Sequence, residues 1–129
     1  MILNKDYTTW KTFGVYTLIL FFLLLCGMNT ANAQTYTCGE DICVVEFNAS
    51  WNETNDTKWL YKLSDVGTKR ILIDKGSWQK DFSIVVTPTT IIFVDGKEVK
   101  RYQANIMMVI EETQKAVQEK IDEIIMEGT

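Results

Sequence analysis

Histidine is absent from this sequence, and its absence excludes several kinds of active site at once. Ser-His-Asp and Cys-His catalysis both need an imidazole base, and imidazole is also the commonest protein ligand of metal ions. We therefore expect no metal site, and no motif indicates a cofactor. Basic residues are scattered in a chain of net charge −4, which argues against nucleic acid and anionic lipid as partners.

The start of the chain has the pattern of an export signal. A weakly basic beginning is followed by an apolar run and by an Ala-Asn-Ala triplet, which has the form of a signal-peptidase site. We predict that residues 1–33 are a cleaved signal peptide. Residues 34–129 are enough for one modest core, so we predict a single exported domain, periplasmic or extracellular.

Two alternatives to cleavage stay open. The apolar run at residues 13–28 is shorter than the roughly 20 residues of a spanning helix, but tilt and bilayer thinning would let it anchor the chain. Cys26 would be the modified residue of a lipoprotein, although the leucine before it is not the small residue expected there. The protein would have a membrane as a partner only if this N-terminal segment were not cleaved.

Cysteine is scarce, and the predicted domain holds only Cys38 and Cys43. An even number of cysteines in an exported chain favours a disulfide, so we predict that these two residues are bonded. The bond would fasten the N-terminal arm to the sheet as a structural staple. An exchangeable redox pair is the alternative.

Hydrophobic periodicity and turn signals predict an α/β fold with the order β-α-β-α-β-β-α. A parallel βαβ unit followed by a hairpin gives a mixed four-stranded sheet flanked by helices. The predicted strands are residues 42–48, 70–74, 89–94 and 97–102. The first predicted helix is capped by Ser50 or Asn52 and runs to about residue 64, the second is residues 78–83, and the third is residues 106–127, capped by Asn105.

Three segments in this order resemble the thioredoxin-like family. They are the Val45-Glu46-Phe47-Asn48-Ala49-Ser50-Trp51 run, which is similar to the family's entry to its active site, the Thr87-Pro88-Thr89 loop and the 91–97 hairpin. The resemblance implies a minimal thioredoxin fold and a cis Thr87–Pro88 bond. It also implies that Glu46 is a buried acid. In the family this acid relays protons to a thiol, and that function is lost where the thiol is absent.

The resemblance fails at the redox motif, because Asn52 and Asn55 stand where the family has the cysteines of Cys-x-x-Cys. Thiol–disulfide exchange needs a thiolate nucleophile and a sulfur leaving group, and an amide is neither. We therefore expect no thioredoxin-type activity. Whether Cys38 and Cys43 form a thiol–disulfide oxidoreductase of another kind stays open.

The resemblance also implies a groove for an extended polypeptide. In the family, the residue before the proline pairs its backbone with the substrate, and here that residue is Thr87. The groove would be walled by Trp51, Pro88 and the helix start that carries Asn52 and Asn55. This predicts a module that binds a polypeptide or protein partner by β-augmentation. A loop that only shapes the fold, and a structural domain of an envelope or virion assembly, are the alternatives.

The same segment carries overlapping glycosylation motifs. Asn48, Asn52 and Asn55 each begin an N-x-[ST] triplet. They would be glycan acceptors in a eukaryotic secretory pathway and chance matches in a bacterium or phage.

Overall fold

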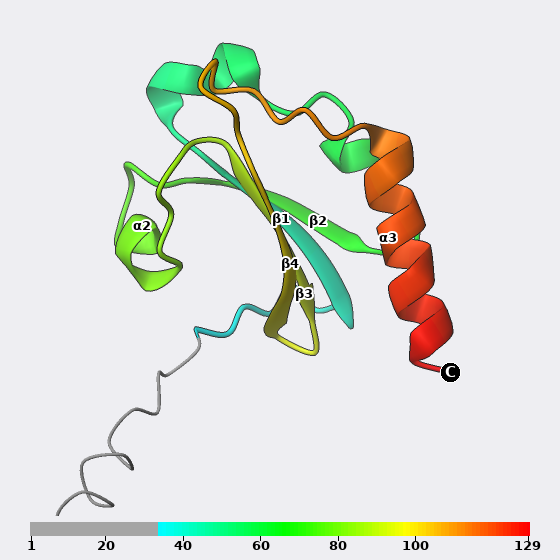
Figure 1. The fold of residues 1–129 in the computed structure, drawn as a ribbon. Coiled ribbons are helices and arrows are strands. Elements are labelled where there is room, and N and C mark those ends of the chain that lie inside the picture. Colours follow the sequence, from blue (N-terminus) through cyan, green and yellow to red (C-terminus); the bar gives the residue numbers. More distant parts are fainter. Residues whose placement is uncertain (1–33) are drawn as a thin grey trace, which may run out of the picture. The chain divides into compact units, whose positions relative to one another are not determined.

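The computed structural model describes residues 34–129 (Figure 1), and the predicted signal or anchor at residues 1–33 lies outside them. Among the helices of the described part, none has the length and hydrophobicity needed to span a membrane. The elements, in which η marks a 3-10 helix, are β1 (Ile42–Asn48), η1 (Ser50–Asn55), η2 (Leu60–Lys62), β2 (Gly67–Leu72), α2 (Trp78–Asp81), β3 (Thr89–Val94), β4 (Lys97–Gln103) and α3 (Gln114–Glu127).

The sheet has the strand order β2-β1-β3-β4, with β1 parallel to β2 and antiparallel to β3. This confirms the predicted α/β architecture with a mixed four-stranded sheet. Strands β1 and β3 are almost wholly buried, as continuous apolar runs in the centre of a sheet should be. Strand β4 is mostly exposed and charged, which suits an edge and discourages pairing with other chains.

The core has two parts because α2 and α3 cover opposite faces of the sheet (Figure 1). Side chains alternate along β1: Val45 and Phe47 pack with the α2 side, whereas Val44 packs with Val117 and Ile121 of α3. Each fully buried aliphatic or aromatic side chain contributes roughly 1.5–3 kcal/mol. The two-sided core therefore fixes the position and register of β1, whose C-terminal end leads into the candidate site.

The prediction for the second strand was wrong at both ends, since β2 begins at Gly67 and ends at Leu72 rather than spanning residues 70–74. Pairing with β1 starts where Gly67 meets Cys43 and continues to Leu72, which meets Asn48. The polar residues at the start of β2 are drawn into the sheet by the parallel ladder, which hydrophobicity alone does not indicate.

The predicted first helix, ending near residue 64, is replaced by the two short 3-10 helices η1 and η2. Hydrogen bonds to side chains occupy backbone N–H and carbonyl groups that would pair with each other in an α-helix. The Asn48 amide donates to the Asn52 carbonyl oxygen at 3.0 Å, and the Thr57 N–H donates to the Glu46 carboxylate at 3.0 Å. Asn and Glu side chains from the strand thus outcompete the i→i−4 pattern.

The last helix begins eight residues later than predicted, at Gln114, where the Thr113 hydroxyl accepts the N–H of Ala116 at 3.2 Å. Asn105 caps no helix. Its side-chain oxygen accepts the N–H groups of Met107 and Val109 at 2.9 and 3.3 Å, which holds residues 104–113 as a loop.

Two predictions that depended on the longer helix are also wrong. In a helix over residues 106–127 the apolar spacing would place Ile106 on the buried stripe, but Ile106 is 99% exposed. The same helix would also pair Glu111 with Lys115 across one turn. Glu111 instead lies in the loop and accepts from the Asn105 amide, while Lys115 faces Glu119 at 4.0 Å.

The predicted disulfide between Cys38 and Cys43 is present, with the two Cα atoms 6.1 Å apart. It fastens the N-terminal arm beside the sheet, where the Tyr36 N–H donates to the Gly96 carbonyl oxygen at 3.0 Å. The Tyr36 ring packs against Phe93 with centroids 5.5 Å apart. The bond therefore closes one end of the α2-side core.

Gly67 gives a test of how closely this staple is packed. A Cβ at Gly67 would lie 2.6 Å from the Cys38 sulfur, so Gly67→Ala is expected to destabilise the protein by about 1–3 kcal/mol in urea unfolding. Gly128→Ala is the control, because the nearest atoms to its Cβ are 3.6 Å away. An undiminished cost in a Cys38→Ala background would show that the sulfur is not the cause.

Candidate functional site

Asn48, Asn52 and Asn55 form one hydrogen-bonded chain where β1 passes into η1. The Asn52 amide nitrogen donates to the Asn48 side-chain oxygen at 3.0 Å, and the Asn55 nitrogen donates to the Asn52 oxygen at 2.8 Å. Asn48 also donates to the Asp56 carboxylate at 2.7 Å. Asn52 is only 4% exposed, so its side chain supports the site from within instead of facing a ligand.

The same burial bears on the glycosylation motifs. The amide nitrogens of Asn48 and Asn52 are both occupied by internal hydrogen bonds, and both residues are buried. A glycan on either nitrogen has no space in this folded structure. Asn55 is partly exposed, and its nitrogen is bonded to Asn52.

Glu46 is fully buried, as the resemblance implied, and both of its carboxylate oxygens accept hydrogen bonds. The Arg70 Nε lies 2.8 Å from Glu46 Oε1, and the Thr57 N–H donates to the other oxygen at 3.0 Å. Burial opposes the charge on Arg70, but the hydrogen bond and charge of Glu46 outweigh it and raise the pKa of Arg70. Asp56, 3.4 Å from Arg70 Nε, joins this ion pair to the asparagine chain.

Arg70 was missed in the sequence, although it lies directly opposite Glu46 in the β1–β2 register. Opposite charges facing each other on neighbouring strands are a recognisable signal. This signal can be recognised only when the register of the two strands is known. The predicted second strand began at Arg70, and the residue opposite Arg70 was not predicted.

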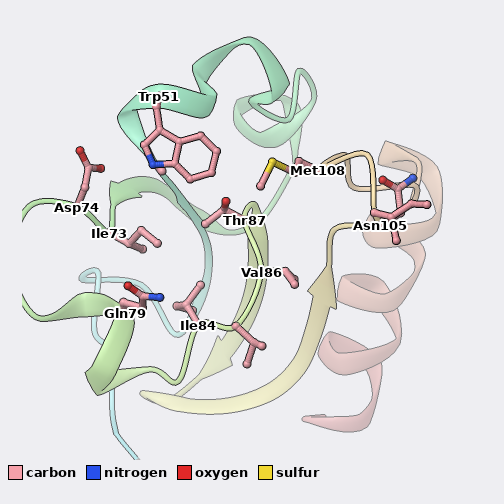
Figure 2. A pocket seen from close by; sticks show the side chains of 12 residues that line it. Trp51, Ile73, Asp74, Gln79, Ile84, Val86, Thr87, Asn105 and Met108 are labelled. Carbon is pink, nitrogen blue, oxygen red and sulfur yellow. The ribbon is translucent and has the colours of Figure 1, made fainter.

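The Thr87–Pro88 bond is cis, as predicted. Thr87 lines a cavity of about 380 Å³ together with Trp51, and Figure 2 shows the indole ring of Trp51 over the cavity beside Thr87. The predicted walls at Pro88, Asn52 and Asn55 were wrong, because Pro88 is buried and none of these three residues lines the cavity. The lining residues are Ala49, Trp51, Ile73, Asp74, Gln79, Ile84, Val85, Val86, Thr87, Asn105, Ile106 and Met108.

The backbone of Thr87 is unpaired in the described part of the chain. Neither its N–H nor its carbonyl oxygen has a backbone partner, whereas the Val86 carbonyl accepts from the Thr89 hydroxyl and the Pro88 carbonyl accepts from the Ala104 N–H. Thr87 is only 6% exposed. Backbone groups in buried residues are nearly always paired, so an unpaired residue at a cavity wall is a natural place for an extended ligand.

The second wall of the cavity was not predicted. The loop at residues 104–113 contributes Asn105, Ile106 and Met108, for which the sequence predicts the cap and first turn of a helix. Asp74 lies on the other side of the cavity and accepts hydrogen bonds from the Ser50 hydroxyl and from the Ser50 N–H, the latter at 3.0 Å. These bonds lower the pKa of the Asp74 carboxyl.

The disulfide lies at the far end of β1 from the cavity. Cys43 is near the start of the strand and Asn48 ends it, and five residues of strand span about 17 Å. Among the residues that line the cavity there is no cysteine. The fold places Trp51 and Thr87 at one cavity, and no thiol lies beside them in its lining.

Neither a protein-family model nor a curated protein sequence matches the chain. Solved structures do match. Thioredoxin-2 of the malaria parasite has a TM-score of 0.51 at 17% identity, over 67% of this chain and 86% of that one. A designed protein has a TM-score of 0.50 at 18% identity, over 67% of this chain and 82% of that one.

A mutant thioredoxin from Halobacterium salinarum was also found, with a TM-score of 0.49 at 20% identity, over 65% of this chain and 74% of that one. Sequence identities this low support a shared fold alone. With the observed sheet order, the opposed helices and the cis-proline loop, the fold is settled. The protein has a thioredoxin-like fold, with asparagines at the two positions that the resemblance assigns to redox cysteines.

Proposed function

We propose that this protein binds extended polypeptide in the cavity between Trp51 and Thr87, by backbone pairing and without thiol chemistry. The observation that carries the proposal is the unpaired backbone of Thr87 at the wall of an apolar cavity. A strand laid along Thr87 would supply the missing hydrogen bonds, and its side chains would enter the cavity.

The walls suit such a ligand. The cavity is lined mainly by apolar side chains, and its volume falls at the lower end of the roughly 300–1,000 Å³ typical of ligand pockets. Trp51 is 67% exposed, and the loop presents Ile106 and Met108 across from it. Exposed tryptophan and methionine are typical of binding surfaces, because both offer large apolar area and methionine adapts its shape.

The proposal includes a location outside the cytoplasm. Residues 1–33 would direct the chain there, either as a cleaved signal or as an anchor. The Cys38–Cys43 disulfide supports this location, because such bonds persist mainly in oxidising compartments. The natural ligand would then be an unfolded or extended segment of another exported protein.

Truncation of the exposed indole tests the proposal. Trp51→Ala is expected to weaken binding of an alkylated, permanently unfolded polypeptide by about tenfold or more, the effect of losing an interface hot spot. Fluorescence anisotropy of the labelled polypeptide measures the change. Tyr61→Ala is the control, because Tyr61 is an equally exposed aromatic residue that does not line the cavity. Equal affinities for both variants and the wild type would refute the proposed cavity.

The observed disulfide supports one competing function, a thiol–disulfide oxidoreductase that uses Cys38 and Cys43. Its environment is unfavourable for exchange. Cys43 is buried in the α2-side core, and Cys38 is partly buried and lies close to Gly67. Attack by an external thiolate needs access to one of the sulfurs, which this packing restricts.

We therefore expect no catalysis of insulin reduction by dithiothreitol above the uncatalysed rate. Turbidity of the released insulin B chain measures the reaction, and an active thioredoxin serves as the positive control. Turnover that disappears in Cys38→Ser would establish the oxidoreductase function in place of peptide binding alone.

A further inference from the structure

Asp74 is the single ionisable residue among those that line the cavity. The rest of the lining is apolar, apart from the neutral side chains of Gln79, Thr87 and Asn105. Figure 2 shows Asp74 on one side of the Trp51 ring, with Met108 and Asn105 on the other. A ligand that fills the cavity therefore meets one fixed negative charge at one end and an apolar wall at the other.

The Asp74 carboxylate is held in place but still has acceptor capacity. The Ser50 N–H and hydroxyl each bond one of its oxygens, which fixes the orientation of the group. A carboxylate has about four lone-pair sites, so roughly half of them stay free for a ligand. An aspartate carboxyl is charged at neutral pH, and the Ser50 bonds hold its pKa below the ordinary value.

Asp74 forms no ion pair within the described part of the chain. The ion pairs within residues 34–129 join other residues. The charge of the adjacent Lys75 contributes to the lowered pKa of Asp74, but Lys75 forms no ion pair with it and lines a different surface hollow with Tyr36 and Trp78. The negative end of the cavity is thus available to a positive group on the ligand.

We propose that the bound polypeptide carries a lysine or arginine two residues from an apolar anchor, with the cation on Asp74 and the anchor between Trp51 and the Ile106–Met108 loop. This inference rests on the proposed function and names the class of segment that the cavity selects. Alternate residues of an extended strand point the same way, so positions i and i+2 enter the cavity together. The net charge of −4 favours approach of such basic segments.

Paired peptides test the selection. Two labelled peptides differ only in Lys or Gln at the position two residues from a leucine, and both are titrated with the purified protein. The wild type is expected to bind the lysine peptide about 2- to 5-fold more tightly, the range of a solvent-accessible ion pair. In Asp74→Asn the two peptides should bind with equal affinity, and 0.5 M salt should reduce the wild-type preference.

Asp81→Asn is the matched control, since Asp81 also accepts a serine hydroxyl, that of Ser77, and lies outside the cavity lining. It should keep the lysine preference, as should the charge-conserving Asp74→Glu. Equal binding of both peptides to the wild type, or a preference that survives in Asp74→Asn, would overturn the selection while Trp51-dependent binding still upheld the proposed function. Failure of both peptides to bind would overturn both.

Discussion

Replacing Arg70 with leucine should destabilise the fold by roughly 3 kcal/mol. The change leaves the fully buried Glu46 carboxylate without its cation, and only the Thr57 N–H still bonds it. Breaking a buried pair by removing one partner costs about 3–5 kcal/mol, and the lower end applies because the Arg70 side chain is 20% exposed and water reaches it. The Thr57 carbonyl oxygen would also lose its guanidinium donor, now at 2.8 Å.

Urea unfolding of the variant measures the loss as a lower midpoint at an unchanged slope. Lys69→Leu is the control, because Lys69 precedes Arg70 on the same strand, is exposed, and should change stability by no more than about 0.5 kcal/mol. Adding Glu46→Gln to Arg70→Leu should recover part of the loss by removing the unpaired charge. A cost below about 1 kcal/mol for Arg70→Leu would show that Glu46 does not depend on its partner.

Asn48→Leu should cost a similar amount, about 3 kcal/mol, and should also weaken polypeptide binding. Asn48 is fully buried, and its amide bonds the Asn52 carbonyl oxygen and the Asp56 carboxylate while accepting from the Ala49 N–H and the Asn52 amide. Leucine has nearly the same size but leaves several buried polar groups unpaired, each at roughly 1–3 kcal/mol before relaxation. Because η1 carries Trp51, loosening this network should displace the indole.

Thermal or urea unfolding gives the stability change, and anisotropy with the unfolded polypeptide gives the binding change. Asn55→Ala is the matched control: Asn55 is partly exposed, its side chain makes a single hydrogen bond, to Asn52, and its loss should cost about 1 kcal/mol or less. An Asn48→Leu protein as stable as the wild type would mean that the asparagine chain is incidental to the fold.

The sheet was accessible from the sequence because its signals are local and agree with one another. Strands β1 and β3 are unbroken apolar runs, and the Asp95-Gly96 pair marks the hairpin that joins β3 to β4. Gly96 indeed has φ near +82°, as such a turn requires. The disulfide and the cis bond also follow from few residues, since the predicted domain has one pair of cysteines and one proline.

The helices were harder to predict because hydrogen bonds between side chains and nearby backbone groups decide where they begin. Apolar spacing continues from Ile106 through Val117, which indicates one long helix. Asn105 instead ties the N–H groups of Met107 and Val109 into a turn, and Met108 adopts a φ near +59° that breaks the helix. Hydrophobic periodicity depends only on which residues are apolar. It does not show that a side chain competes with the helix for backbone N–H groups.

The candidate site, too, was predicted only in part. Trp51 and Thr87 were identified from the resemblance, and they do line one cavity. Ile106 and Asp74 were not, because each reaches the cavity from an element whose end was misplaced: Ile106 from a loop taken for a helix, and Asp74 from beyond the true end of β2. Cavities are made by the ends of elements, which sequence patterns locate least well.

Capture of extended polypeptide along Thr87 is tested most directly by the Thr87 amide itself. Two-dimensional ¹H–¹⁵N NMR of the protein, titrated with the unfolded polypeptide, reports on that amide and on the Trp51 indole N–H together. Backbone pairing predicts that both signals shift with one binding curve and that hydrogen exchange of the Thr87 N–H, unpaired in the free protein, slows on binding. Saturable binding that leaves the Thr87 amide unshifted and its exchange unchanged would contradict capture at this residue.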